Sequence, residues 1–126
     1  MEEVGTVVKN LANGKTPGGD GLLAEFFKQF RASLAPRLLR VYENAWTEGE
    51  LPESTREVVV IPLPKKGQEA GRVQSYRPIS MLTVDYKILS KVLAIRLLPI
   101  LPELVHRDQS GFVPNRSTSH NVCRLM

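Results

Sequence analysis

The chain is poor in cysteine, with Cys123 as its only thiol among 126 residues. One cysteine cannot form an internal disulfide, so we expect a reducing, intracellular environment, with nucleus and cytoplasm not distinguished. Long apolar runs are also missing, because no stretch approaches the roughly twenty residues that a membrane helix needs. The acidic start MEEVGTVVKN does not have the pattern of a signal peptide. We therefore expect a soluble protein with no membrane partner.

Aspartate is scarce as well, and the chain has only Asp20, Asp85 and Asp108. None of them is spaced from another acid so that two carboxylates share one strand or helix face. Two-metal nucleotidyl transfer needs such a pair, so the sequence predicts neither a catalytic residue nor a metal site. Zinc is disfavoured too, because His120 and Cys123 find only His106 as a third partner, which does not close a four-ligand site.

Charge is divided unevenly along the chain, although the net value is only +4. Residues 1–64 hold seven basic and nine acidic side chains, which gives −2, and residues 65–126 hold ten and four, which gives +6. A basic half is typical of proteins that contact nucleic acid or nucleotide phosphates. A solvated surface can have the same composition, so charge alone leaves both interpretations open.

Helical apolar spacing dominates the first half of the chain. It predicts helices over 2–11 and 22–34, and a third that starts at Pro36, with Tyr42 and Trp46 packed inward. A last long helix is predicted over residues 84–98, capped by Thr83 or Asp85, with Lys87 and Lys91 on its solvent face. These two lysines either follow a nucleic-acid backbone or are simply solvated.

A glycine-rich loop covers residues 13–21, between the first two predicted helices. Four glycines and a proline in nine residues exclude regular structure there. Such a loop can present Lys15 and backbone N–H groups to a phosphate, although its spacing does not match the phosphate-binding loop consensus. Its simpler role is a helix entry in which Asp20 caps the next helix.

The stretch from Val58 to Leu82 predicts an antiparallel hairpin. Residues 58–61 are β-branched throughout and are followed by Pro62 and Pro64, which favours a short buried strand that the prolines stop. The chain returns after the eleven residues 65–75. The fold class is therefore α+β, mostly helical with a small antiparallel β-hairpin.

The hairpin loop is cationic, because it holds Lys65, Lys66 and Arg72, and Arg77 enters the returning strand close to it. Several cations on one hairpin make an anion clamp that suits polyphosphate. Arg77 is the strongest single candidate. Its alternative role is a surface ion pair with Glu57 or Asp85.

Several motifs follow one another in a recognisable order. They read NGKTPGGDGLLAEFFK, then WTEGELPESTREVVVIPLPKKG, SYRPISML, DYKILSKVLAIRL and DQSGFVPNRST. Together they resemble the amino-terminal part of the reverse transcriptase domain of LINE-type (non-LTR) retrotransposons, from about Leu11 to Leu125. The resemblance implies that residues 1–126 are the fingers and the start of the palm of that domain, without the catalytic palm.

The resemblance also implies a set of contacts. Lys65 and Arg77 match the fingers cations that contact the triphosphate of the incoming nucleotide. Mg²⁺ in the complete enzyme would be held by palm residues outside this chain, and the partners would be an RNA template, a DNA primer, a deoxynucleoside triphosphate and the rest of the polymerase domain. With the residues argued above, the candidate nucleic-acid contacts are Lys15, Lys66, Arg72, Lys87, Lys91 and Arg116.

Two positions depart from the family pattern. The glycine-rich loop has the family form PGxDG, but Gly19 occupies the x position, where proline is usual in the family. In the GFxxGRS pattern that contains Arg116, Asn115 replaces a glycine. Asparagine tolerates a left-handed backbone, so the turn before Arg116 can survive.

Two other functions remain open from the sequence. One is a non-catalytic nucleic-acid-binding or adaptor protein of the same ancestry, whose RNA binding would weaken steeply with salt. The other is a decayed copy that folds only marginally, which partial unfolding or rapid proteolysis would reveal.

Overall fold

The computed structural model describes residues 2–69, 71–106, 108–117 and 119. The predicted fold class is confirmed, since helices and a single two-stranded antiparallel sheet make up the regular structure of the part of the chain that is described. The chain divides into two compact units, Met1–Leu89 and Ser90–Met126. No helix within the described ranges is long and apolar enough to cross a membrane.

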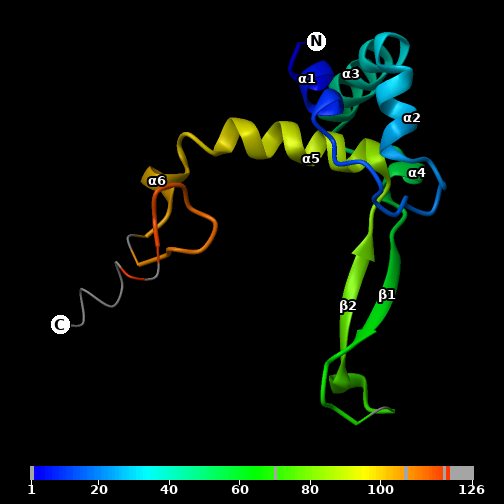
Figure 1. Cartoon of the computed structure of the whole chain (residues 1–126). Coiled ribbons are helices and arrows are strands. Elements are labelled where there is room, and N and C mark those ends of the chain that lie inside the picture. The colour runs from blue at the N-terminus through cyan, green and yellow to red at the C-terminus, as the bar shows by residue number, and fades with distance from the viewer. Residues whose placement is uncertain (1, 70, 107, 118, 120–126) are drawn as a thin grey trace. The chain divides into compact units, whose positions relative to one another are not determined.

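Three helices of the first unit pack against one another: α1 (Glu2–Lys9), α2 (Ala24–Gln29) and α3 (Arg31–Glu48). In α1 the apolar residues recur at helical spacing, which places them on one face. Figure 1 shows the three helices gathered together. The side chains that their packing buries are Val4, Val7, Val8, Ala24, Phe27, Ala35 and Tyr42.

The predicted boundary between the second and third helices is wrong. The chain turns at Phe30, and Pro36 lies inside α3 instead of starting it. The Phe30 carbonyl accepts the N–H groups of Ser33 and Leu34, so it closes the first turn of α3. Proline is compatible with helical φ and removes only one hydrogen bond near this end of the helix. The inward placement of Trp46 is also wrong, because its side chain is 85% exposed.

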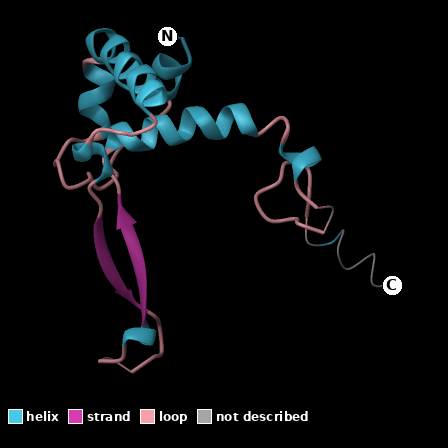
Figure 2. Cartoon of the chain, turned by 180° about the vertical axis from the view of Figure 1, so that it is seen from behind, coloured by secondary structure: helices cyan, strands magenta, loops and turns pink. Residues whose placement is uncertain are grey.

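The hairpin follows a short helix, α4 (Glu53–Arg56). It consists of β1 (Val59–Pro64), the 3-10 turn η1 (Val73–Ser75) and β2 (Tyr76–Met81). The register runs from Val59 opposite Met81 to Pro64 opposite Tyr76. The predicted antiparallel hairpin with the loop 65–75 is therefore confirmed. In Figures 1 and 2 the two strands run away from the α1–α3 cluster to that loop.

Pro62 does not stop β1, contrary to the prediction, and the strand ends at Pro64, the second predicted stop. The Lys65 N–H donates to the Ser75 carbonyl at 2.8 Å, which makes these residues a hydrogen-bonded pair. Pairs alternate along an antiparallel ladder, so Pro62 opposite Pro78, and Pro64 opposite Tyr76, fall at non-hydrogen-bonded positions. Their missing N–H groups therefore cost no ladder bond.

The prediction of a buried strand is wrong as well, since every residue of β1 is exposed. Val59 and Val60 are 50% and 57% exposed. A sheet of two strands has no central strand, so both strands are edge strands. The β-branched run reports strand propensity correctly, but propensity carries no information about what covers the strand.

The long helix α5 (Val84–Leu97) confirms the prediction over residues 84–98. Val84, Ile88 and Val92 are buried on it, whereas Leu97 is half exposed. In the second unit, α6 (Leu101–Leu104) leads into an irregular segment that is described to residue 117, with one break. His120 and Cys123, between which a zinc site was disfavoured, lie outside the described residues.

Candidate nucleotide and nucleic-acid interface

The hairpin end is closed by Lys65. Its backbone N–H donates to Ser75, and its Nζ donates to the Gln74 carbonyl at 2.7 Å. The turn that follows returns the Gln68 N–H to the Lys65 carbonyl at 3.3 Å, with Gly67 at φ 78°. A positive φ at this position explains the glycine. Lys65 is thereby held at the last pair of the ladder, with its ammonium near the loop.

Arg77 lies in β2, directly opposite Leu63, and its side chain is exposed. It makes no ion pair with any described residue, so the alternative pairing with Glu57 or Asp85 is not observed. The Asp85 carboxylate instead accepts hydrogen bonds from elsewhere, as described below. Arg77 is thus a cation without a countercharge among the residues described.

The pleat relates Arg77 to Lys65. Side chains two residues apart on a strand point to the same face, and directly opposite residues share a face. Leu63 is opposite Arg77, and Lys65 follows Leu63 by two residues on the strand side of the ladder. The backbone therefore places Lys65 and Arg77 on one face of the hairpin, at neighbouring positions on the two strands.

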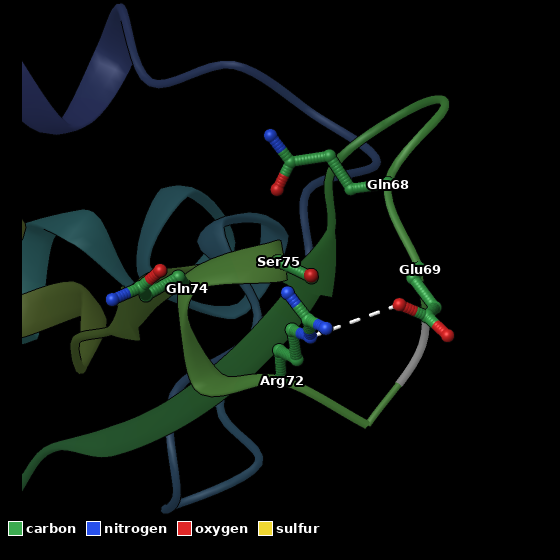
Figure 3. Close-up of a pocket in the computed structure, with 5 residues that line it drawn as sticks. All are labelled: Gln68, Glu69, Arg72, Gln74 and Ser75. Atoms are coloured by element: carbon green, nitrogen blue, oxygen red, sulfur yellow. Dashed lines mark ion pairs between the residues drawn. The ribbon is translucent and has the colours of Figure 1, made fainter.

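A small cavity of about 220 Å³ lies at the hairpin end. Arg72 reaches across it to Glu69, with 3.7 Å between Nε and Oε2 (Figure 3). Both partners are largely exposed, so this ion pair contributes little to stability. The Glu69 carboxylate partly balances the charge of Arg72. Lys66 is exposed in the turn. The lining residues are Gln68, Glu69, Arg72, Gln74 and Ser75.

The other end of the hairpin is fixed by Asp85 at the start of α5. Its Oδ1 accepts the Tyr86 N–H at 2.8 Å, and its Oδ2 accepts the Thr55 hydroxyl at 3.2 Å. The Tyr42 hydroxyl donates to the Asp85 carbonyl at 2.8 Å. Burial, with a smaller contribution from the Asp85 charge, raises the pKa of Tyr42 well above its ordinary value. Of the two predicted caps, Asp85 is the one that bonds a helix N–H.

The glycine-rich loop crosses this same base. A Cβ on Gly18 would lie 2.6 Å from the Thr83 Cα, so only glycine allows the close approach. The predicted capping role of Asp20 is wrong. Its Oδ1 accepts the Leu22 N–H at 3.2 Å, and α2 starts after Leu23 with no side-chain cap. The aspartate two residues before Leu22 closes a local turn instead.

Glu25 ties the loop to α2. Its Oε1 accepts the Gly14 N–H at 2.6 Å, and the Lys28 ammonium bonds the Asn13 side chain. The Gly14 hydrogen bond is the main reason that the pKa of Glu25 is lowered, and Lys28 makes a smaller contribution. Lys15 lies exposed in the loop between these anchors.

The remaining predicted contacts differ in exposure. On α5, Lys91 is exposed and Lys87 is half-buried. Arg116 is used differently: its guanidinium donates to the carbonyls of Pro102, His106 and Gln109 at 2.7, 2.7 and 3.0 Å, and more weakly to that of Val105.

Arg116 therefore organises the segment 102–116, a role that the sequence interpretation missed. The signal was present, because carbonyls at the end of a short helix such as α6 attract a basic side chain. Asn115 has φ 61°, which confirms that asparagine supports the left-handed turn expected before Arg116.

A metal site does not form among the residues described. They contain no group of three histidine, cysteine or acidic side chains that could hold an ion. The catalytic magnesium of a polymerase does not fit this part of the chain. The residues available here are cations and hydrogen-bond donors suited to phosphate.

Comparison with known proteins agrees with this chemistry. Residues 63–125 match the family model described as reverse transcriptase (RNA-dependent DNA polymerase). The match includes β2 and the cations of the hairpin and its loop. The chain belongs to the reverse transcriptase family, and the resemblance to its LINE-type members is confirmed.

Three relatives come from mobile elements. The chain is 41% identical to a transposon TX1 uncharacterized 149 kDa protein of Xenopus laevis, over 97% of this chain and 9% of the relative. It is 28% identical to a probable RNA-directed DNA polymerase from transposon BS of Drosophila melanogaster, over 99% of this chain and 14% of the relative. It is 25% identical to an RNA-directed DNA polymerase from mobile element jockey of the same fly, over 100% and 14%. The chain thus spans 9–14% of the length of these curated relatives.

Proposed function

We propose that this chain is the fingers and the start of the palm of an RNA-directed DNA polymerase from a non-LTR retrotransposon. In this role it contacts the incoming deoxynucleoside triphosphate and the RNA template paired with a DNA primer. The observation that carries the proposal is the β1–β2 hairpin, which presents Arg77 without a countercharge on the same face as Lys65. Both residues fall inside the segment that matches the family.

The two cations have complementary chemistry toward a triphosphate. Arg77 offers a planar fork that binds phosphate oxygens in pairs, and Lys65 offers a compact point charge. Lys65 is held by one carbonyl, which a phosphate oxygen can replace with a stronger, charge-assisted bond. Cations fixed in advance also stabilise the negative charge that grows on phosphoryl oxygens during transfer.

Nucleic-acid backbone contacts would come from cations that have no strong partner in the structure. Lys66 and Arg72 flank the nucleotide cations on the hairpin loop, and Lys15, Lys87 and Lys91 lie on the glycine-rich loop and on α5. Arg116 supports such binding through the loop that it shapes, because its guanidinium is already bonded to carbonyls.

The chemical step itself needs groups that the described residues do not offer. Two metal ions held by carboxylates are required for nucleotidyl transfer, and those carboxylates would lie in other parts of the polymerase. The 126-residue chain is therefore expected to bind template and primer without extending the primer.

Fluorescence anisotropy with an RNA template annealed to a DNA primer tests this proposal. We expect affinity to fall linearly on a logarithmic salt scale, and each phosphate contact removed should lower the slope by about 0.7–0.9. Lys66→Ala should lower it, whereas Lys9→Ala, exposed on α1, should not. An affinity that does not change with salt concentration would exclude the proposal.

The non-catalytic alternative is separated by primer extension. A longer chain of the same element that carries a carboxylate pair should extend the primer if the polymerase assignment is right. RNA binding without extension by that longer chain would favour the adaptor function instead.

A further inference from the structure

The hairpin that carries Arg77 and Lys65 is joined to the helices through its two roots, the connections from α4 to β1 and from β2 to α5. Within the described chain, β1 and β2 pack on each other, and neither strand makes an extensive contact with a helix. Every residue of β1 is exposed, and so are the four central residues of β2. The orientation of the hairpin therefore depends on how its roots are held.

A side-chain hydrogen bond links the two roots. Thr55, in α4, lies four residues before Val59. Asp85, in α5, lies four residues after Met81, which is the ladder partner of Val59. The Thr55 hydroxyl donates to Asp85 Oδ2 at 3.2 Å. This bond closes the hairpin beyond its last backbone pair, and Figure 1 shows α4 and the first turn of α5 together at that point.

The same aspartate is fixed to the helix cluster. The Tyr42 hydroxyl donates from α3 to the Asp85 backbone carbonyl at 2.8 Å, and Asp85 Oδ1 accepts the Tyr86 N–H at 2.8 Å. Thr55 and Tyr42 are buried, so water does not compete freely for these bonds. Asp85 therefore connects α3, α4 and α5 where both strands leave the helices.

We propose that Thr55, Asp85 and Tyr42 form a root lock that holds the hairpin at one angle to the helices. Asp85 is then a positioning residue for Arg77 and Lys65, because it acts on them only through the orientation of the hairpin. This inference rests on the proposed nucleotide role of the two cations. It adds the element of the fold that decides where those cations lie.

The length of the hairpin makes the position of Arg77 sensitive to its roots. Arg77 is four residues from Met81, the end of β2. At about 3.4 Å per residue this is roughly 14 Å, so a tilt of about 10° at the roots moves Arg77 by about 2 Å. A displacement of that size separates a guanidinium from a phosphate that it would otherwise bond.

Distances between spin labels on the complete 126-residue chain test the root lock directly. The labelled positions are Arg37→Cys on α3 and Val73→Cys at the hairpin loop, both exposed, with Cys123→Ser to remove the native thiol. Double electron–electron resonance then reports the spread of hairpin orientations. We expect Thr55→Val to widen the distance distribution, and Thr55→Ser, which keeps the hydroxyl, to leave it as narrow as in the parent chain.

Two further variants separate the root lock from a general loss of hydrogen bonding. Tyr42→Phe removes the other bond to Asp85 and should also widen the distribution. Thr47→Val is the matched control, because the Thr47 hydroxyl bonds the Glu43 carbonyl at 3.0 Å within α3, and it should have no effect. Parental widths in both Thr55→Val and Tyr42→Phe would overturn the proposal.

Nucleotide kinetics in a longer polymerase of this family that carries this segment connect the root lock to Arg77. We expect Thr55→Val to raise KM for the deoxynucleoside triphosphate about three- to tenfold with kcat unchanged, because only the fraction of molecules with the hairpin in place binds nucleotide tightly. Thr55→Ser should restore the parental KM. In an Arg77→Ala background the further effect of Thr55→Val should be smaller, since the residue that it positions is gone.

The outcomes distinguish this inference from the proposed function. Equal effects of Thr55→Val with and without Arg77 would contradict a positioning role. An effective Arg77→Ala together with a silent Thr55→Val would overturn the root lock alone. Parental kinetics in Arg77→Ala would overturn the proposed nucleotide role, and with it the positioning role of Asp85.

Discussion

Two arginines, in different parts of the molecule, are used in opposite ways. Arg77 lies on a regular strand, is exposed and has no ion pair among the described residues. Arg116 lies in an irregular segment, and its guanidinium is bonded to the carbonyls of Pro102, Val105, His106 and Gln109. Both were predicted from the sequence as contacts for anionic ligands.

Backbone hydrogen bonding explains the difference. In the hairpin Arg77 faces Leu63 at a hydrogen-bonded position of the ladder, so the backbone there is paired without its side chain, which keeps its donors for a ligand. The described residues of the segment 102–116 form no ladder, and carbonyls at the end of α6 need donors. A basic residue in a motif is therefore available for a ligand only where the local backbone does not need it.

The largest expected effect is at Arg116. Arg116→Ala should destabilise the segment 102–116 by about 3 kcal/mol, because several charge-assisted bonds are lost together. Amide hydrogen exchange would show loss of protection across this segment. Arg116→Lys should not restore it, since one ammonium cannot span four carbonyls. Normal protection in Arg116→Ala, with weaker RNA binding, would make Arg116 a ligand contact after all.

Gly18→Ala has the next largest expected effect and tests whether the glycine-rich loop packs tightly against the base of the hairpin that carries Arg77. We expect a loss of about 2 kcal/mol in the free energy of unfolding, because the new methyl meets Thr83 backbone. Chemical denaturation measures it. Gly5→Ala, with open space around it inside α1, should instead stabilise by about 0.5–1 kcal/mol. A neutral Gly18→Ala would mean that the loop does not press on the hairpin base.

Tyr42→Phe removes one hydrogen bond from the same base. The Asp85 carbonyl loses its hydroxyl donor, and we expect a cost of about 1 kcal/mol in denaturant unfolding. Tyr86→Phe is the matched control and should cost less than about half of that. Equal effects of the two substitutions would show that the Tyr42 hydroxyl does not anchor α5.

The smallest expected effect is pH-dependent and concerns Glu25. Its pKa is lowered in the folded chain, mainly by the Gly14 N–H, so it binds fewer protons folded than unfolded near its ordinary pKa. Its stabilising contribution is therefore present above about pH 4.5 and is lost as pH falls through the lowered pKa. Thermal unfolding of Glu25→Gln should have a shallower acid limb than the parent chain. Superimposable acid limbs would refute the loop attachment.

The antiparallel pairing and the loop of the hairpin could be predicted from the sequence, although the end and the burial of the first strand could not. The loop 65–75 contains Gly67 and Gly71, both with positive φ, and the runs on either side differ in composition from it. Local chemistry decides such a turn. The exposure of β1 and of Trp46 could not be predicted, because apolar periodicity shows which residues share a face but not whether another element covers that face.

The residue types of the candidate site could be predicted from the sequence, but the partners that their side chains bond could be predicted only in part. The motif order identified the family and selected Lys65 and Arg77 as nucleotide contacts, which remains a prediction. The guanidinium of Arg116 donates to backbone carbonyls, and Gly18 closely approaches Thr83. Both contacts depend on backbone geometry that no residue pattern specifies.

Nucleotide kinetics of Arg77→Ala, made in a longer polymerase of this family that carries this segment, test the central claim most directly. We predict that kcat/KM for the deoxynucleoside triphosphate falls about ten- to a hundredfold, with template affinity unchanged. Arg37→Ala, exposed on α3, is the matched control and should have no effect. Unchanged KM and kcat in Arg77→Ala would contradict the assignment of the hairpin to the nucleotide.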